Sequence, residues 1–430
     1  MKRTSFNPLT SLHAILIGGA LFSGALVNAD DLKFSFGASA EQGFKPVAAS
    51  AAYDAKSGYG FLTPAATPEA PSIFAVDVPE GNYQVVLRFG DANKATSTTV
   101  KAEARRLMLE KVDTQPGQFE TRTILVNVRR PEISSGGTVG LKKGEEESAD
   151  WDNHLSLEFN GKQPGVASVE IKPAADVPTL FIAGDSTVTD QPREPWSSWA
   201  QALPRFFAPD IAVADHAWSG LTLSSFAGQH RLDKILSQVR KGDYVLVQFG
   251  HNDQKDKGKD AGPYTTYKAN LRKYISAIRE KGGVPVLVTP MERRRWDSNT
   301  PKPTLSDFAQ AVRQIGWEQS VPVIDLNAMS LKLYTAFGPE PSKNLFVWYP
   351  ADSFPGQKTE LKDDTHHSVF GGYELARCIV EGIKANVPDL AAHLAKDVGD
   401  FDPSHPDSPE KFDIPRTPSS ATPIEKPAGS

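Results

Sequence analysis

The chain has 430 residues, which is enough for two or three domains, and two is the working number. Hydrophobic residues make up 39% of it and charged residues 23%, and its formal net charge of −5 offers no overall cationic surface for nucleic acid. Cys378 is the only cysteine and cannot form a disulfide within the chain, so stability must come from the burial of apolar surface.

The first 29 residues have the pattern of a signal peptide. Lys2 and Arg3 precede an apolar stretch, and small residues lead to a predicted cleavage point after Ala29. A membrane anchor or a first strand is the alternative interpretation, but the apolar stretch is well short of the roughly 20 residues that span a bilayer. We therefore expect a periplasmic or secreted protein that has no membrane contact in its mature form.

Residues 31–175 show the alternation that is typical of β-strands. Tyr83, Val85, Leu87 and Phe89 alternate with more polar neighbours, which predicts a half-buried antiparallel strand. Turn signals such as Asn160-Gly161 separate such segments, and no long amphipathic helix intervenes. This region is therefore predicted to be an antiparallel β-sandwich.

Residues 178–396 alternate short apolar strands with amphipathic helices, which predicts a doubly wound α/β domain of flavodoxin-like type, with a parallel sheet. The helix pattern is clearest at residues 271–278, where Leu271, Tyr274, Ile275 and Ile278 share one face. Residues 397–430 are rich in Pro, Ser and charge, and we expect a disordered tail there. The predicted strands are 179–183, 211–213, 244–249, 284–289 and 321–326.

Ligands of open α/β sheets bind at the carboxyl ends of the strands, so the residues that follow each strand are the first candidates for a site. The first predicted strand is followed by Gly184-Asp185-Ser186-Thr187-Val188. Glycine permits a tight turn, and backbone amides beside the serine would meet an oxyanion. A serine that caps the next helix is the alternative.

Two further strand ends carry candidate hydrogen-bond donors. Gly220 would let a backbone N–H approach a ligand, although a glycine that serves only its turn is the alternative. Asn252, in the segment Phe249-Gly250-His251-Asn252-Asp253, would donate from its side-chain amide to a developing negative charge. A turn that caps the next helix is the alternative there.

The segment Asp363-Asp364-Thr365-His366-His367-Ser368 lies near the end of the α/β region. An aspartate three residues before a histidine accepts from one imidazole nitrogen, so that the other faces the serine as general base. The doubled residues allow two such pairs, Asp363 with His366 and Asp364 with His367. A metal site or an incidental polar loop is the alternative. The sequence has no zinc-type spacing such as H-E-x-x-H, so we expect no metal and no cofactor.

The order of these motifs, G-D-S, Gly, G-x-N-D and D-x-x-H, resembles the four sequence blocks of the SGNH (GDSL-like) hydrolases. Within that superfamily the chain is similar to the rhamnogalacturonan acetylesterases at residues 249–253, 288–290, 293–295 and 361–366. The resemblance covers about residues 180 to 385. One departure is Asp215-His216-Ala217-Trp218, where the family has a small, asparagine-led stretch before Gly220.

The resemblance implies a serine esterase with an acyl-enzyme mechanism. Ser186 would be the nucleophile, His366 the base and then the acid, and Asp363 the residue that orients it. This first Asp-x-x-His pair is preferred because it keeps the family's D-x-T-H order. The oxyanion hole would consist of the backbone N–H groups of Ser186 and Gly220 and the side chain of Asn252.

The resemblance also implies a substrate, an acetylated plant cell-wall polysaccharide of the pectic rhamnogalacturonan type. Arg293, Arg294 and Arg295 follow the fourth predicted strand, where guanidinium groups would pair with uronate carboxylates, and a solvated surface cluster is the alternative. Acetylated xylan or another neutral glycan is the second candidate substrate. A non-catalytic carbohydrate-binding protein or a lipase is a weaker hypothesis, since the residue types needed for catalysis are all present and no amphipathic apolar lid is evident.

The region 31–175 resembles, more loosely, the galactose-binding-like sandwiches that are attached to some of these esterases. The residues that carry this resemblance are Phe34-Ser35-Phe36-Gly37, Tyr53 and Gly58-Tyr59-Gly60-Phe61. Such a domain would either bind sugar or pack against the catalytic domain.

Overall fold

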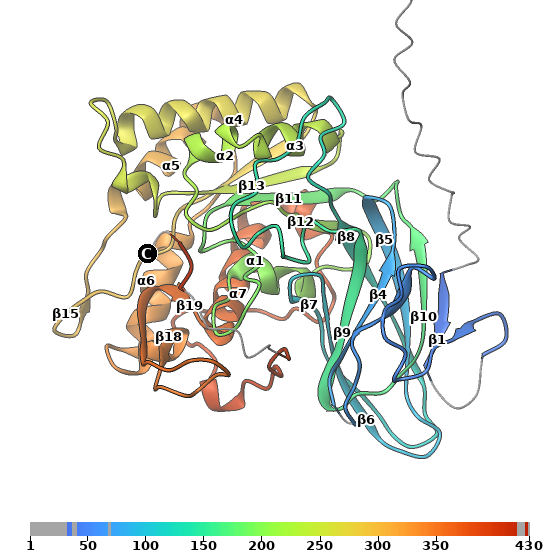
Figure 1. Cartoon of the computed structure of the whole chain (residues 1–430). Helices are drawn as coiled ribbons and strands as arrows, with labels where there is room; N and C mark the ends of the chain where they lie inside the picture. Colours follow the sequence, from blue (N-terminus) through green and yellow to red (C-terminus); the bar gives the residue numbers. More distant parts are fainter. Residues whose placement is uncertain (1–31, 37–40, 68–69, 419–425, 429–430) are drawn as a thin grey trace, which may run out of the picture.

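The computed structural model describes residues 32–36, 41–67, 70–418 and 426–428 (Figure 1). The predicted signal peptide, residues 1–29, lies outside this range. Among the described residues, no helix combines the length and the apolar character that crossing a bilayer requires.

The N-terminal region is a β-sandwich, as predicted. Two five-stranded sheets, ordered β2-β1-β10-β5-β8 and β3-β4-β9-β6-β7, pack face to face, and all their pairings are antiparallel except β1 with β2. The apolar side chains that alternate along β5 point into the core that both sheets share. The first sheet contains β1 Lys33–Ser35, β2 Lys45–Pro46, β5 Gly81–Phe89, β8 Glu120–Val128 and β10 Val166–Pro173. The second contains β3 Tyr59–Thr63, β4 Ser72–Asp77, β6 Thr96–Ala102, β7 Arg106–Thr114 and β9 His154–Gln163.

The C-terminal region is the predicted doubly wound α/β fold. Its parallel sheet has the order β12-β11-β13-β14-β17, so the second strand in sequence lies at one edge and the first lies inside. All six residues of β11 are buried, because helices cover both faces of the sheet. The strands are β11 Thr179–Gly184, β12 Ala212–Asp215, β13 Tyr244–Gln248, β14 Val284–Val288 and β17 Val323–Ile324.

Two groups of helices form the outer layers (Figure 1). The helices on one face are α2 Leu223–Gly228, α3 Arg231–Gln238, α4 Lys268–Glu280 and α5 Ser306–Gln319. On the other face are α1 Trp199–Ala202, α6 Leu326–Phe337, α7 Val369–Asn386 and α8 Pro388–Ala391. The predicted face of residues 271–278 is buried in α4.

Short elements complete the fold. Two small antiparallel pairs are β15 Trp296–Asp297 with β16 Thr300–Pro301, and β18 Phe346–Tyr349 with β19 Leu361–His367. The single-turn segments are η2 Leu203–Phe206, η3 Asp253–Lys255, η4 Pro263–Tyr267, η5 Pro341–Leu345 and η6 Pro409–Lys411.

Residues 397–418, for which the sequence predicts a disordered tail, contact both regions of the chain in the structure. Phe412 packs on Phe370 and Tyr373 of α7, with ring centroids 5.3 and 5.4 Å apart. Farther along, Lys101 of the sandwich donates from Nζ to the carbonyl of Pro415 (2.7 Å). The segment has no periodicity of its own because it is held by contacts with both regions rather than by a regular element.

Buried ion pairs join the sandwich to the α/β region. Arg106, the first residue of β7, places Nε 2.6 Å from Asp190 Oδ2 and Nη2 3.0 Å from Asp150 Oδ1. A second pair links Glu145 of the β8–β9 connection to Arg231 of α3, and both side chains are fully buried. Because buried charges are costly unless they are paired, these contacts fix how the two regions meet.

Candidate active site

Ser186 lies in the turn that follows β11, at the carboxyl edge of the sheet. Gly184 makes the turn possible, because a Cβ there would lie 2.5 Å from the Val188 side chain. Gln191 donates from Nε2 to the Ser186 carbonyl (2.6 Å) and steadies the turn. Ser186 is not a helix cap, since the next helix, α1, is capped by Ser198.

His366 connects Ser186 to Asp363 through two hydrogen bonds. Its Nε2 lies 2.9 Å from Ser186 Oγ, and its Nδ1 lies 2.8 Å from Asp363 Oδ2. A carboxylate only accepts, so Nδ1 carries the proton and Nε2 accepts from the serine hydroxyl. Asp363 Oδ1 also accepts from the amides of Thr365 (2.9 Å) and His366 (3.1 Å), which fixes the carboxylate. All three side chains of this chain of hydrogen bonds are buried.

The environment keeps Asp363 ionised. Burial by itself raises the pKa of this carboxyl group, but the hydrogen bond and charge of His366, together with backbone amides, outweigh it and hold the pKa well below its usual range. Lys426 Nζ lies 3.5 Å from Asp363 Oδ2 and adds a positive charge. Asp363 therefore remains the negative partner of the imidazole.

The second Asp-x-x-His pair is directed elsewhere. His367 Nε2 lies 2.9 Å from the Tyr334 hydroxyl, and burial, followed by the charge of His366, lowers the pKa of His367 to about 3. Asp364 pairs with Arg294 (2.9 Å) and Arg295 (3.1 Å). The structure thus places only the first pair at Ser186.

The three predicted oxyanion donors follow neighbouring strands. Gly220 has a φ of 77°, a left-handed conformation that glycine adopts without strain. Within the described part of the chain, neither its amide nor that of Ser186 donates a hydrogen bond. Asn252 uses Nδ2 on the carbonyl of Leu221 (3.1 Å), which leaves its second N–H for a ligand.

The three predicted substrate-binding arginines have separate environments. Arg293 reaches the site, where it donates to Thr365 Oγ1 (3.3 Å) and to the His251 carbonyl (3.1 Å). Arg294 is buried and Arg295 is exposed, and both are bound to Asp364 instead. Of the three side chains, Arg293 is the one that bonds to Thr365 and His251 rather than to the carboxylate of Asp364.

Four further residues at the site were not assigned from the sequence. Trp196 donates from Nε1 to Asp363 Oδ2 (3.4 Å), and the buried ring of His251 lies 3.8 Å from Asp185. Lys255 Nζ lies 3.4 Å from Asn252 Oδ1. Lys142 donates from Nζ to the carbonyl of Ser219 (3.3 Å) and comes from the other region of the chain. His251 and Lys255 lie beside the G-x-N-D motif, but no local pattern marks Lys142.

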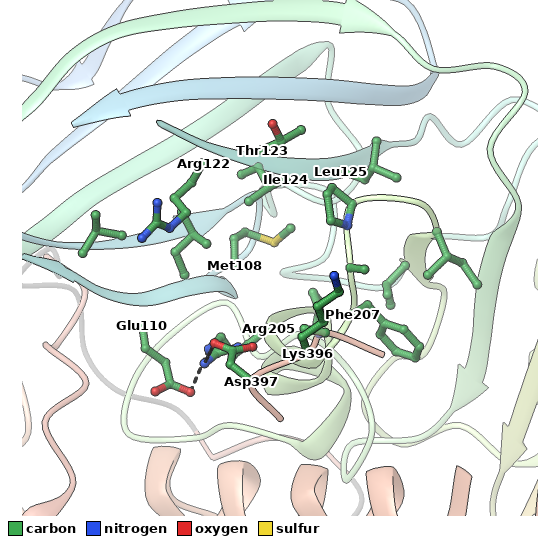
Figure 2. A pocket seen from close by; sticks show the side chains of 18 of the residues that line it. Met108, Glu110, Arg122, Thr123, Ile124, Leu125, Arg205, Phe207, Lys396 and Asp397 are labelled. Carbon is green, nitrogen blue, oxygen red and sulfur yellow. Dashed lines mark hydrogen bonds and ion pairs between the residues drawn. The ribbon is translucent and has the colours of Figure 1, made fainter. Parts of the chain in front are cut away.

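A cavity of about 470 Å³ lies at the junction of the two regions (Figure 2). Apolar side chains of β7 and β8 line it together with Phe207, and the ion pair between Glu110 and Arg205 crosses its edge. None of the predicted site residues lines this cavity. Among the described residues there is also no group of three or more His, Cys, Asp or Glu side chains arranged to hold a metal ion.

Comparison with known proteins identifies the family. Residues 182–356 match the GDSL-like Lipase/Acylhydrolase family. Rhamnogalacturonan acetylesterase RhgT of Bacillus subtilis (strain 168) is 40% identical over 223 residues, which are 51% of this chain and 95% of that protein. The probable rhamnogalacturonan acetylesterase YesY of the same strain is 33% identical over 208 residues, 48% of this chain and 92% of that protein. The uncharacterized esterase YxiM, also of that strain, is 26% identical over 375 residues, 82% of this chain and 90% of that protein. The chain therefore belongs to the GDSL-like lipase/acylhydrolase family.

Proposed function

We propose that this protein is a serine carbohydrate esterase that removes acetyl groups from pectic rhamnogalacturonan. The observation that carries the proposal is the continuous hydrogen bonding from Ser186 Oγ through His366 to Asp363, with distances of 2.9 and 2.8 Å. Such an arrangement activates a hydroxyl for attack on a carbonyl carbon.

In the first step, Ser186 Oγ attacks the acetyl carbonyl while His366 Nε2 takes the hydroxyl proton. The imidazolium that forms is stabilised by the ionised Asp363. The carbonyl oxygen becomes an oxyanion that accepts hydrogen bonds from the amides of Ser186 and Gly220 and from Asn252. Collapse of this intermediate gives an acetyl-enzyme, and the sugar hydroxyl leaves with the proton from His366.

In the second step, water replaces the sugar. His366 Nε2 takes a proton from the water as it attacks the acetyl carbon, and the same three donors hold the new oxyanion. Release of acetate returns the proton to Ser186. Each proton therefore passes through a single imidazole nitrogen, while Asp363 keeps the other nitrogen protonated.

Two observations support a pectic substrate. The relatives RhgT and YesY are named as rhamnogalacturonan acetylesterases, YesY as a probable one. Arg293, whose hydrogen bonds go to neutral oxygens of Thr365 and His251, carries a positive charge beside the triad. A uronate carboxylate of the pectic backbone is a suitable partner for that charge.

The proposal includes export to the periplasm or the medium. It rests on the sequence of residues 1–29, with its basic start, apolar stretch and small residues before position 29.

The decisive test is Ser186→Ala. We expect this variant to keep the circular dichroism spectrum and melting temperature of the parent and to release acetate from acetylated rhamnogalacturonan at least about a thousandfold more slowly. A fluorophosphonate probe should label the parent and not the variant. Acetate release at the parental rate would overturn the proposed mechanism.

The substrate class is tested on the parent alone. Acetate release is compared on acetylated rhamnogalacturonan, xylan and mannan at equal acetyl content. The pectic polymer should give the highest kcat/KM. A clear preference for a neutral glycan would leave the serine mechanism intact and overturn the pectic assignment.

A further inference from the structure

Lys142 belongs to the N-terminal region but lies at the catalytic edge of the α/β sheet. It is part of the connection between β8 and β9, which leaves the sandwich and crosses onto the α/β region. The backbone of that connection is anchored there, since the amide of Gly140 donates to the carbonyl of Gln229 (2.9 Å).

A buried ion pair holds the turn that carries Lys142. Its amide donates to Glu145 Oε2 (3.0 Å), and Glu145 in turn is bound by Arg231 of α3 and by Trp151 Nε1 (2.8 Å). Because Glu145 and Arg231 are fully buried, the turn is held in one position. The ammonium group of Lys142 is therefore presented by a preorganised backbone.

The ammonium group contacts the turn that supplies a proposed oxyanion donor. Lys142 Nζ donates to the Ser219 carbonyl (3.3 Å), and a Cβ added to Gly220 would lie 3.5 Å from it. Among the described residues, no carboxylate lies within ion-pair distance of Lys142. Its charge faces a neutral oxygen, so an incoming anion would gain a charge-assisted hydrogen bond.

Two further cations lie beside other residues of the candidate site. Lys255 lies beside Asn252, and Arg293 beside Thr365. Burial, and then the charge of Arg231, lowers the pKa of Lys142, while burial and the charge of Arg293 lower the pKa of Lys255. The negative charge of an anionic ligand would offset both the lost solvation of these ammonium groups and their repulsion by neighbouring cations.

We infer that Lys142 is a specificity-determining residue, through which the N-terminal region binds a carboxylate of the polysaccharide beside the acetylated sugar. This inference rests on the proposed function and extends it, because it makes the sandwich and its β8–β9 connection part of the substrate site. The expected ligand is a uronate, whose carboxylate would lie between Lys142 and the sugar ring that carries the ester.

The test uses the complete mature chain and three variants, Lys142→Ala, Lys142→Arg and Lys143→Ala. Each is assayed on acetylated rhamnogalacturonan and on 4-nitrophenyl acetate, which has no carboxylate. In Lys142→Ala, the ratio of kcat/KM for the polymer to that for the small ester should fall about tenfold, through KM. Lys142→Arg keeps the charge and should hold the ratio within about threefold of the parent.

Lys143→Ala is the matched control. Lys143 is the next residue along and is exposed, so its removal changes the net charge of the chain by the same amount without touching Ser219. It should leave the ratio unchanged. In the parent, KM for the polymer should rise with added salt more steeply than in Lys142→Ala.

Three results would overturn the inference. These are equal ratios in Lys142→Ala and Lys143→Ala, an equal loss on both substrates in Lys142→Ala, and no recovery in Lys142→Arg. An equal loss would mean that Lys142 only supports the Gly220 turn. If the parent itself released no acetate from any ester, the proposed function would fail instead, so the two failures are distinguishable.

Discussion

The two Asp-x-x-His pairs of β19 are adjacent in sequence and have the same chemistry, yet their surroundings differ completely. Asp363 and His366 face Ser186. Asp364 and His367 face arginines and the hydroxyl of Tyr334, respectively. The comparison shows that an aspartate and a histidine at this spacing become catalytic candidates only through what the strand places in front of them.

An irregularity in β19 separates the pairs. The neighbouring residues Phe346 and Val347 of β18 pair with His367 and Asp363, so residues 364–366 have no partner on that strand and form a bulge. Bulges re-aim side chains and are frequent next to active sites. Here the bulge brings His366 back over Asp363, which regular alternation along a strand would not do.

The two histidines give the largest contrast. His366→Gln should lower kcat/KM for acetate release by about 10⁴ or more, because the base and acid of both steps is lost. His367→Gln should keep the rate within a few fold and instead lower the free energy of unfolding by about 1–3 kcal/mol, since it disturbs a buried hydrogen bond to Tyr334.

Acetate assays and urea unfolding of both histidine variants provide the measurement. If His367→Gln lost as much activity as His366→Gln, with an intact fold, the assignment of the first pair would be wrong.

The two aspartates should show the same contrast as the two histidines, with one variant losing activity and the other losing stability. The difference in activity should be smaller. Asp363→Asn should slow acetate release by about 10³–10⁴, because an amide presents the wrong partner to His366 Nδ1. Asp364→Asn should instead destabilise the chain by about 2–4 kcal/mol, since it leaves the buried guanidinium of Arg294 without its carboxylate.

Acetate-release kinetics and chemical unfolding of Asp363→Asn and Asp364→Asn test whether the first aspartate serves activity and the second serves stability. An activity loss in Asp364→Asn that matched that of Asp363→Asn would contradict the separation.

Much of the α/β region could be predicted because its signals are local. A continuous apolar run such as 179–183 is typical of a strand covered on both faces, and strand ends are where ligands bind. Ser186, Asn252 and His366 each lie in short motifs, so the sequence alone nominates them as candidates. The contact of Ser186 Oγ with His366 Nε2 at 2.9 Å is not local, because β19 lies outside the parallel sheet and pairs with β18.

The remaining features depend on contacts between distant segments, which a single sequence does not encode locally. The bulge in β19 exists only relative to β18, and the contacts of residues 397–418 need the surface of α7. Lys142 reaches Ser219 only because a buried ion pair docks the β8–β9 connection on α3. Arg294 and Arg295 looked equivalent to Arg293 because the position of Asp364 could not be foreseen.

The smallest expected effect is a difference in pH dependence of stability, and it isolates His367. The pKa of this histidine is lowered to about 3 in the folded chain, whereas an unfolded chain binds a proton near pH 6.5. Below pH 6.5 the unfolded state therefore takes up a proton that the folded state does not, and stability falls with falling pH by about 1.4 kcal/mol per unit. Between pH 6.5 and 5 this amounts to about 2 kcal/mol.

Glu374, whose pKa burial raises to about 7, works in the opposite direction over the same range, so the parent alone cannot isolate the effect. The difference in stability between parent and His367→Gln does isolate the contribution of His367, because Glu374 contributes equally to both proteins. Urea unfolding at pH 7, 6 and 5 should show the stability gap between parent and His367→Gln closing as the pH falls, and a constant gap would mean that His367 is not held neutral by the fold.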